Sequence, residues 1–334
     1  MNAGTALLAS VRETLGRWLL VAACLALAAT FLHPHLMVTQ PRYRLLFVLD
    51  VSQSMNAMDR EMRGEPVSRL TFARSMLRQA LRELPCGSQA GLGLFTEYRT
   101  FLLLEPVEVC GNYGELASAL DRLDYRMAWA GGSEISKGVF FGMRVARDLD
   151  PPPALVFATD GHEAPPLHPK LRPQYDGSAG DVRGMLVGVG GDSLVPIPKF
   201  GVDGKPLGYW AADEVLQIDV YSRGRTGSVV GESMVDQETH EAEGQTARGG
   251  EHLTSLRESH LRELASELGL GYHRLESAGG LVSALEEADV AQEVRGPVDV
   301  RAVLGGGAMV ALVLIYLLPP RRPGLLREPV NRRI

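Results

Sequence analysis

Cysteine is scarce in this sequence: its 334 residues include only three, which excludes a disulfide-rich scaffold. No cluster of Lys and Arg interrupts the middle of the chain, so nothing there indicates nucleic-acid binding, and no internal repeat is present. The net charge of −6 is modest, and a hydrophobic content of 45% is that of a folded protein. The length is ample for one domain of about 200 residues with appendages.

Three enzyme motifs are present only in part. Gly191-Asp-Ser-Leu194 spells the nucleophile signature of a lipase and esterase family, but no histidine has an Asp three positions before it to serve as the base. Ser193 stands where a dinucleotide-binding loop needs a third glycine. Asp50-Val-Ser52 lacks the second Asp of aspartyl phosphatases. We therefore expect no enzyme; a metal-dependent hydrolase whose base escapes these patterns is the alternative.

Two apolar runs lie near the ends of the chain. Trp18 to Leu32 is apolar apart from Thr30, and we predict a transmembrane anchor over 18–38, with a cleaved signal peptide as the alternative. The second run, 302–318, has no charged residue, and we predict a second transmembrane helix there. Each run has a further alternative, because a buried core helix is also apolar.

Arginines flank the two runs and predict the topology. Arg12 and Arg17 precede the first run, and the tail 319–334 after the second is Arg-rich, so both ends are expected in the cytoplasm. This places residues 39–300 outside, in the periplasm of a bacterial inner membrane. Arg42, Arg44, Arg295 and Arg301 on the opposite flanks weaken the bias.

Strand and helix patterns alternate between the two runs. We predict strands at 44–49, 90–95, 100–104, 154–159, 184–189 and 271–275, and helices at 68–84, 115–123, 134–149, 258–268 and 280–287. A hairpin is expected over 196–210, turning at Asp203-Gly204. This alternation predicts an α/β fold with a Rossmann-like, doubly wound and mostly parallel sheet over 41–290. A Gly-, Ser- and Glu-rich stretch at 222–251 is expected to be a mobile insertion.

Polar residues follow two of these strands and one loop. Asp50, Ser52 and Ser54 come directly after the apolar run 44–49, Ser133 ends the loop Trp129-Ala-Gly-Gly-Ser133, and Asp160 follows the strand at 154–159. Ligands bind at the carboxyl ends of strands in open α/β sheets, and hard cations take carboxylate and hydroxyl oxygens. Alternatively, Asp50, Ser52 and Ser54 only cap backbone N–H groups at a strand-to-helix turn.

These three stretches, in this order, resemble the metal-ion-dependent adhesion site of von Willebrand factor A (VWA) domains. The resemblance implies that Asp50, Ser52, Ser54, Ser133 and Asp160 hold Mg2+, or Ca2+ or Mn2+, and that a carboxylate of a partner protein completes the coordination. The family usually has Thr where this chain has Ser133, and serine keeps the oxygen. The implied role is metal-dependent protein recognition without catalysis; a passive membrane scaffold without metal is a further alternative.

A narrower resemblance is to bacterial membrane VWA proteins encoded beside MoxR-type AAA+ ATPases. Leu84-Pro-Cys86-Gly, Pro106-Val-Glu-Val-Cys110, Met127-Ala-Trp129 and Thr159-Asp160-Gly-His-Glu-Ala-Pro165 look most like the L-type proteins of methanol dehydrogenase clusters. That similarity implies a part in the maturation of a periplasmic dehydrogenase, including metal insertion. The implied partners are such an ATPase and other VWA proteins of the cluster. The ATPase is cytoplasmic, so the contact would run through the tails or other subunits, or the topology would be reversed.

Four further side chains leave alternatives open. Cys86 and Cys110 flank two predicted strands; they are either two unrelated thiols or, if the domain lies outside the cytoplasm, a disulfide. His162 is expected to be an exposed loop residue, with ligand contact as the alternative. Glu134 adds charge near the site or serves as a first-turn helix carboxylate.

Overall fold

The structure is a computed structural model that describes residues 3–32, 34–167, 172–201, 203–212, 214–215, 252–288 and 290–317. The chain divides into two compact units, one of Pro41–Glu293 and one of Met1–Gln40 with Val294–Ile334. The expected mobile insertion at 222–251 and the Arg-rich tail at 319–334 lie outside the described residues.

A six-stranded sheet forms the centre of the larger unit. Its strand order is β13-β8-β7-β2-β5-β6, and every neighbouring pair is parallel except β5 and β6. The strands are β2 (Arg44–Asp50), β5 (Gln89–Thr96), β6 (Arg99–Glu108), β7 (Ala154–Thr159), β8 (Gly184–Gly188) and β13 (Gly271–Arg274). The predicted mostly parallel α/β sheet is therefore confirmed, with an antiparallel edge strand.

Strand β2 lies in the middle of this sheet because its side chains are apolar on both faces. Alternate residues of a strand point to opposite sides, so Leu45, Phe47 and Leu49 enter one buried cluster while Leu46 and Val48 enter the other. Strands β5 and β7 flank β2, and Phe47 lies opposite a residue of each. The last residue of β2 is Asp50, so burial of the strand also fixes the place of this carboxylate.

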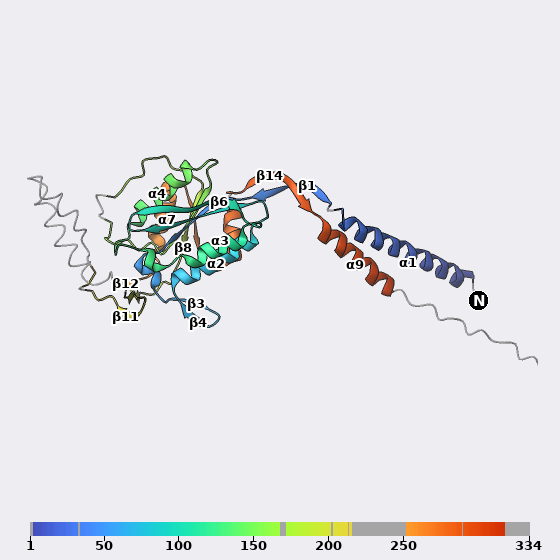
Figure 1. Cartoon of the computed structure of the whole chain (residues 1–334), viewed down its shortest axis with the longest axis horizontal. Coiled ribbons are helices and arrows are strands. Elements are labelled where there is room, and N and C mark those ends of the chain that lie inside the picture. Colours follow the sequence, from blue (N-terminus) through green and yellow to red (C-terminus); the bar gives the residue numbers. More distant parts are fainter. Residues whose placement is uncertain are drawn as a thin grey trace, which may run out of the picture. The chain divides into compact units, whose positions relative to one another are not determined.

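Helices cover both faces of the sheet. Helices α2 (Arg69–Glu83), α3 (Tyr113–Arg122) and α8 (Ala278–Glu287) pack on the face of Phe47. Helices α4 (Ile135–Asp148) and α7 (Glu258–Leu268) pack on the face of Val48. Figure 1 shows α2 and α3 on one side of the sheet and α4 and α7 on the other. The doubly wound arrangement places the loops that follow β2 and β7 at one edge of the sheet.

Helix α2 illustrates how local signals set the element boundaries. The Ser68 hydroxyl accepts a hydrogen bond from the Thr71 amide at 3.1 Å and so caps the first turn. The apolar stripe of the helix is buried in the core on the Phe47 side of the sheet. Leu84 ends the helix just before Pro85, which cannot donate a backbone hydrogen bond.

Short elements surround the carboxyl edge of the sheet. They are the 3-10 turns η1 (Gln53–Asn56) and η2 (Tyr125–Met127) and the strand pairs β3–β4 (Arg60–Met62, Glu65–Val67), β9–β12 (Val195–Pro196, Leu253–Thr254) and β10–β11 (Pro198–Phe200, Pro206–Tyr209). The pair β10–β11 is the predicted hairpin, and Asp203 accepts the Lys205 amide at its turn. Phe200 of this hairpin stacks on Tyr125 of η2, with ring centroids 4.7 Å apart.

The smaller unit contains α1 (Ala3–Thr30), β1 (His35–Arg42), β14 (Gln292–Asp299) and α9 (Arg301–Leu317). Strands β1 and β14 pair, and helices α1 and α9 pack against each other (Figure 1). Small side chains lie at the helix contact, since Ala23 and Ala308 are both buried. Large apolar side chains of both helices, Trp18 and Tyr316 among them, are exposed.

The predicted anchor at 18–38 is not one continuous helix. Helix α1 ends at Thr30, and residues from His35 onward form β1. The reason is Pro34, which lacks the N–H that a continuing helix needs. Helix α9 is 17 residues long and covers the predicted span at 302–318 except for its last residue. Within the described ranges, no helix has both the length and the apolar stretch required to cross a membrane.

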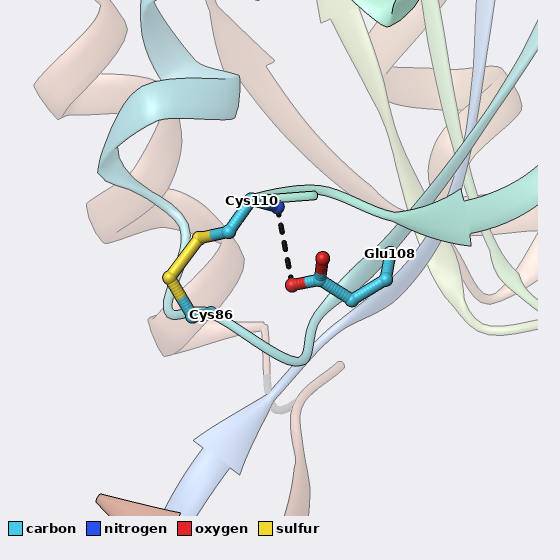
Figure 2. Close-up of side chains that lie close together, drawn as sticks. All are labelled: Cys86, Glu108 and Cys110. Carbon is cyan, nitrogen blue, oxygen red and sulfur yellow. Dashed lines mark hydrogen bonds between the residues drawn. A yellow bond between two sulfur atoms is a disulfide. The ribbon is translucent and has the colours of Figure 1, made fainter. Parts of the chain in front are cut away.

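Cys86 and Cys110 form a disulfide. Figure 2 shows the bond beside Glu108, with the two Cα atoms 5.4 Å apart. The Glu108 carboxylate accepts hydrogen bonds from the amides of Gly87, Cys110 and Gly111, and these bonds, that of Gly111 first, lower its pKa. The bridge thus joins the segment after α2 to the segment after β6, and Glu108 holds both together.

A close contact between α4 and the sheet predicts opposite effects of two Gly→Ala changes on one helix. A Cβ at Gly138 would lie 2.1 Å from the buried ring of Phe95, whereas a Cβ at Gly142 would make ordinary contacts of 3.5 Å. We expect Gly138→Ala to lower the free energy of unfolding by about 1–3 kcal/mol through overpacking. Gly142→Ala should leave it unchanged or raise it by up to about 1 kcal/mol, because alanine favours the helix. Urea unfolding of both variants checks this, and equal effects would show that the close approach of α4 is not as described.

Candidate metal site

The loop of Asp50, Ser52 and Ser54 turns into the protein interior directly after β2. Asp50, Ser52 and Ser54 are all buried, and the hydroxyl oxygens of the two serines lie 3.4 Å apart. Asp50 Oδ1 accepts the Ser52 amide at 2.8 Å, and Oδ2 accepts the Thr159 hydroxyl at 2.6 Å. Ser52 occupies the N-cap position of η1 but makes no capping hydrogen bond with its side chain. Backbone hydrogen bonding therefore accounts for one oxygen of Asp50, whereas the Ser52 hydroxyl bonds to that of Ser54 and does not cap the turn.

Ser133 lies between the segments that follow β5 and β7. It forms bridges with Glu97 on one side and Ala164 on the other, and it exchanges backbone hydrogen bonds of 2.6 and 2.8 Å with Ala164. Its side chain is only 3% exposed, and its hydroxyl has no hydrogen-bond partner among the described residues. A buried polar group without a partner is costly, so this hydroxyl is arranged for a ligand.

Asp160 follows β7 and is fully buried, with its carboxylate bonded to an arginine that sequence analysis did not select. Arg69 Nη1 donates to Asp160 Oδ2 at 2.5 Å, and the His162 amide donates to Oδ1 at 3.0 Å. Arg69 also pairs with Asp59, at 2.6 Å between Nη2 and Oδ2. The sequence signal that was missed is a cation in the first turn of α2, where the helix dipole disfavours positive charge.

Burial and neighbouring charges shift the pKa values of Asp50, Arg69 and Asp59. Burial raises the pKa of Asp50 to about 7, and the nearby charge of Asp160 adds to this, while the bonds from Thr159 and Ser52 partly offset it. Burial alone would lower the pKa of Arg69, but Asp160 and Asp59 raise it above its ordinary value. Burial likewise opposes ionisation of Asp59, yet Arg69 brings its net pKa below the usual range. Arg69 is therefore charged and has two anionic partners.

Two expectations near the site are resolved by the structure. His162 is only 4% exposed, so the expectation of an exposed loop histidine is wrong; burial lowers its pKa, which keeps the imidazole neutral. Its position is fixed because its amide bonds to Asp160 next to the sheet. Glu134 lies at the start of α4 and pairs with Lys137, so it is a helix-terminal carboxylate.

Glu163 holds the loop of Ser133 in place, and the sequence patterns did not indicate this role. Its carboxylate accepts the amides of Ile135 and Ser136 at 3.0 and 2.8 Å, and the Ser136 hydroxyl at 2.7 Å. A carboxylate at a helix N-terminus satisfies free N–H groups and suits the dipole. Glu163 therefore fixes the start of α4, two residues after Ser133.

The donor set fits a hard divalent cation. Asp50, Ser52, Ser54 and Ser133 supply a carboxylate and three hydroxyls, the oxygen ligands that Mg2+ and Ca2+ take, and Mg2+ keeps waters at its remaining positions. The orphaned hydroxyl of Ser133 is the observation that decides the fit. Asp160 belongs to the same edge of the sheet, but one of its oxygens is bonded to Arg69.

A second group of possible metal ligands has another role. Within the described part of the chain, one set of three Cys, His, Asp or Glu side chains converges closely enough to hold an ion: Cys86, Glu108 and Cys110. Both sulfurs belong to the disulfide, and Glu108 accepts three backbone amides. This group is a structural crosslink (Figure 2).

Comparison with known proteins identifies the fold around the site. Residues 45–162 match the family model described as von Willebrand factor type A domain. The central part of this chain is a von Willebrand factor type A domain. The matched segment begins in β2 and ends two residues after Asp160, so this A domain contains all five predicted ligands.

Solved structures similar to this chain include bacterial membrane proteins. An aerotolerance-related membrane protein from Bacteroides fragilis is 16% identical, with a TM-score of 0.45, and the match covers 74% of this chain and 98% of that one. BatB from Bacteroides thetaiotaomicron has 16% identity, a TM-score of 0.46 and the same coverages of 74% and 98%. A membrane-spanning protein from Vibrio fischeri is 18% identical, with a TM-score of 0.28 over 74% of this chain and 98% of its own. No curated protein matches the sequence.

Replacement of Ser133 tests whether its unpartnered hydroxyl binds the cation, and replacement of Ser136 in α4 is the matched control. Ser133→Ala should weaken Mg2+ or Mn2+ binding by roughly tenfold or more, equivalent to about 1.4 kcal/mol. It should change the metal-free stability little, because no hydrogen bond is lost. Ser136→Ala should do the reverse, because the Ser136 hydroxyl bonds to Glu163: a loss of about 1 kcal/mol of stability with unchanged cation affinity. Calorimetric titration and urea unfolding measure the two quantities, and wild-type affinity in Ser133→Ala would remove Ser133 from the site.

Proposed function

We propose that this A domain binds a divalent cation through Asp50, Ser52, Ser54 and Ser133 and uses it to hold a carboxylate of a partner protein. The observation that carries the proposal is the buried, unpartnered hydroxyl of Ser133. Protein ligands from two loops leave coordination positions open, and a carboxylate oxygen is a suitable ligand for them. The edge of the sheet at which the strands end is where open α/β folds bind ligands.

Exposed apolar side chains on the ligand-bearing loops support a protein partner. Met58 follows the loop of Ser52 and Ser54 and is 51% exposed, and Trp129 precedes Ser133 and is 58% exposed. Trp129 is held in place, since its indole N–H donates to Glu97 at 3.0 Å and its ring meets Phe101 edge to face. Exposed Trp and Met side chains are enriched in protein interfaces.

Recognition fits the contacts of the site better than catalysis. Asp50, the residue with a pKa near neutrality, accepts the Ser52 amide and the Thr159 hydroxyl. The Ser52 and Ser54 hydroxyls lie against each other. No described histidine is bonded to either hydroxyl. We therefore propose a binding site without turnover.

We place the domain on the outer side of a membrane. The Cys86–Cys110 disulfide supports an oxidising compartment, and exposed apolar side chains of α1 and α9 support contact with lipid. Maturation of a periplasmic dehydrogenase together with a MoxR-type AAA+ ATPase is the more specific role that we propose, on the resemblance of the four sequence stretches given above. Trapping of thiols in intact cells tests the compartment: maleimide labelling of Cys86 and Cys110 without a reductant would place the domain in the cytoplasm.

A passive scaffold without metal is the second candidate. Arg69 already supplies a positive charge to Asp160, so the fold does not require a cation at that carboxylate. The two candidates differ in one respect: a scaffold binds its partner equally well with and without divalent cations.

Photo-crosslinking from the exposed position Met58 separates these functions. We expect the wild-type chain to cross-link a partner in Mg2+, and to lose the product in EDTA and in Ser133→Ala, while Ser136→Ala keeps it. An equal yield in Mg2+, EDTA and Ser133→Ala would contradict the proposal and favour the scaffold. Turnover of ester or phosphate substrates that Asp50→Ala abolishes would instead favour the hydrolase.

A further inference from the structure

Arg69 is the largest fully buried side chain in the described part of the molecule. It occupies the first position of α2, where the helix dipole disfavours a cation. Removal of a guanidinium from water is costly unless it is paired and hydrogen-bonded. Its position therefore requires strong compensation from its neighbours.

That compensation comes from two carboxylates on different segments. The Nε and Nη2 atoms form a fork on Asp59, at 3.0 and 2.6 Å, while Nη1 bonds to Asp160 at 2.5 Å and to the Thr254 hydroxyl at 2.9 Å. Asp59 itself accepts the Gly191 amide at 2.8 Å. The guanidinium thus ties together the loop after η1, the end of β7 and β12.

The backbone is shaped around this guanidinium. A Cβ at Gly190 would lie 2.8 Å from Arg69 Nε, and Gly190 has a φ of +140°, which side-chain-bearing residues rarely adopt. The chain at Gly190 therefore leaves room for the Arg69 guanidinium only because this position has no side chain.

We propose that Arg69 is an internal counter-ion that competes with the divalent cation for Asp160 and so sets the cation affinity of the site. The inference rests on the proposed cation site and names the residue that limits its affinity for the cation. The positive charge of Arg69 is shared between Asp59 and Asp160, so Asp160 presents a reduced negative field to a cation held by Asp50 and the three serines. Release of Asp160 should strengthen cation binding.

The decisive variant is Arg69→Met with Asp59→Asn. This pair of changes leaves the net charge unaltered, because one cation and one anion are removed together, and it frees Asp160 without leaving Asp59 buried and unpaired. In the full chain, we expect the double variant to bind Mg2+ or Mn2+ about ten to a hundred times more tightly than wild type by calorimetric titration. Arg60→Met is the control, because Arg60 pairs with Glu276 and has no bond to Asp160; its affinity should stay at the wild-type value.

A further change shows whether the gain comes from Asp160. Asp160→Asn should lower the affinity much more in the Arg69→Met/Asp59→Asn background than in wild type, where the carboxylate is already engaged; this coupling is measured by a mutant cycle. Should the double variant fail to fold, Arg69→Lys takes its place, since one ammonium cannot reproduce the fork on Asp59 together with the bond to Asp160. It is expected to bind the cation more tightly than wild type.

The outcomes separate this inference from the proposed function. If wild type binds the cation and the Arg69 variants bind it equally, the inference is overturned and the cation site stands. If only the Arg69 variants bind, the inference is supported and the proposed function of the native chain fails. If none binds, both are overturned.

Discussion

The constraint on which this molecule depends is the burial of two carboxyl groups at one edge of its central sheet. Strands β2 and β7 run side by side in parallel, and their register, with Leu49 opposite Ala158, brings Asp50 and Asp160 to adjacent strand ends inside the protein. Such carboxylates need partners that hold them. Thr159 and the Ser52 amide bond to Asp50, and Arg69 pairs with Asp160. The surrounding loops are organised to provide these groups, and a cation bound to Asp50 would complete the balance.

The elements that position the site could be predicted from local patterns. The strand at 154–159 and the helix at 258–268 have the predicted bounds, and the strand that ends at Asp50 differs by one residue, because long apolar runs and clear helix signals leave few alternatives. The predicted ligands Asp50, Ser52, Ser54, Ser133 and Asp160 all lie in buried positions at the expected end of the sheet, since strand order and alternation determine which loops share an edge. Whether they hold a cation stays a prediction.

Contacts between distant segments could not be predicted. Arg69 is 91 residues from Asp160, and nothing around Ser68 indicates that its neighbour is buried. The partners of Glu163 lie 27 and 28 residues before it, so its role depends on the placement of α4. The β3–β4 hairpin was missed because Arg63 and Gly64 form its turn, with φ of 56° and 83°, in place of the more usual Asn-Gly. The end of α1 was missed because apolar composition outweighed the signal of Pro34 in the prediction.

The most direct test of the cation site is a crystal structure of the full chain grown with Mn2+, with anomalous scattering measured at the manganese edge. The account predicts one strong peak at about 2.1 Å from a carboxylate oxygen of Asp50 and from the hydroxyl oxygens of Ser52, Ser54 and Ser133, the distance at which small hard cations bind oxygen. The absence of a peak there at saturating Mn2+, with the Ser133 hydroxyl still without a partner, would contradict the account. The A domain would then be a protein scaffold whose buried charge is balanced by Arg69 alone.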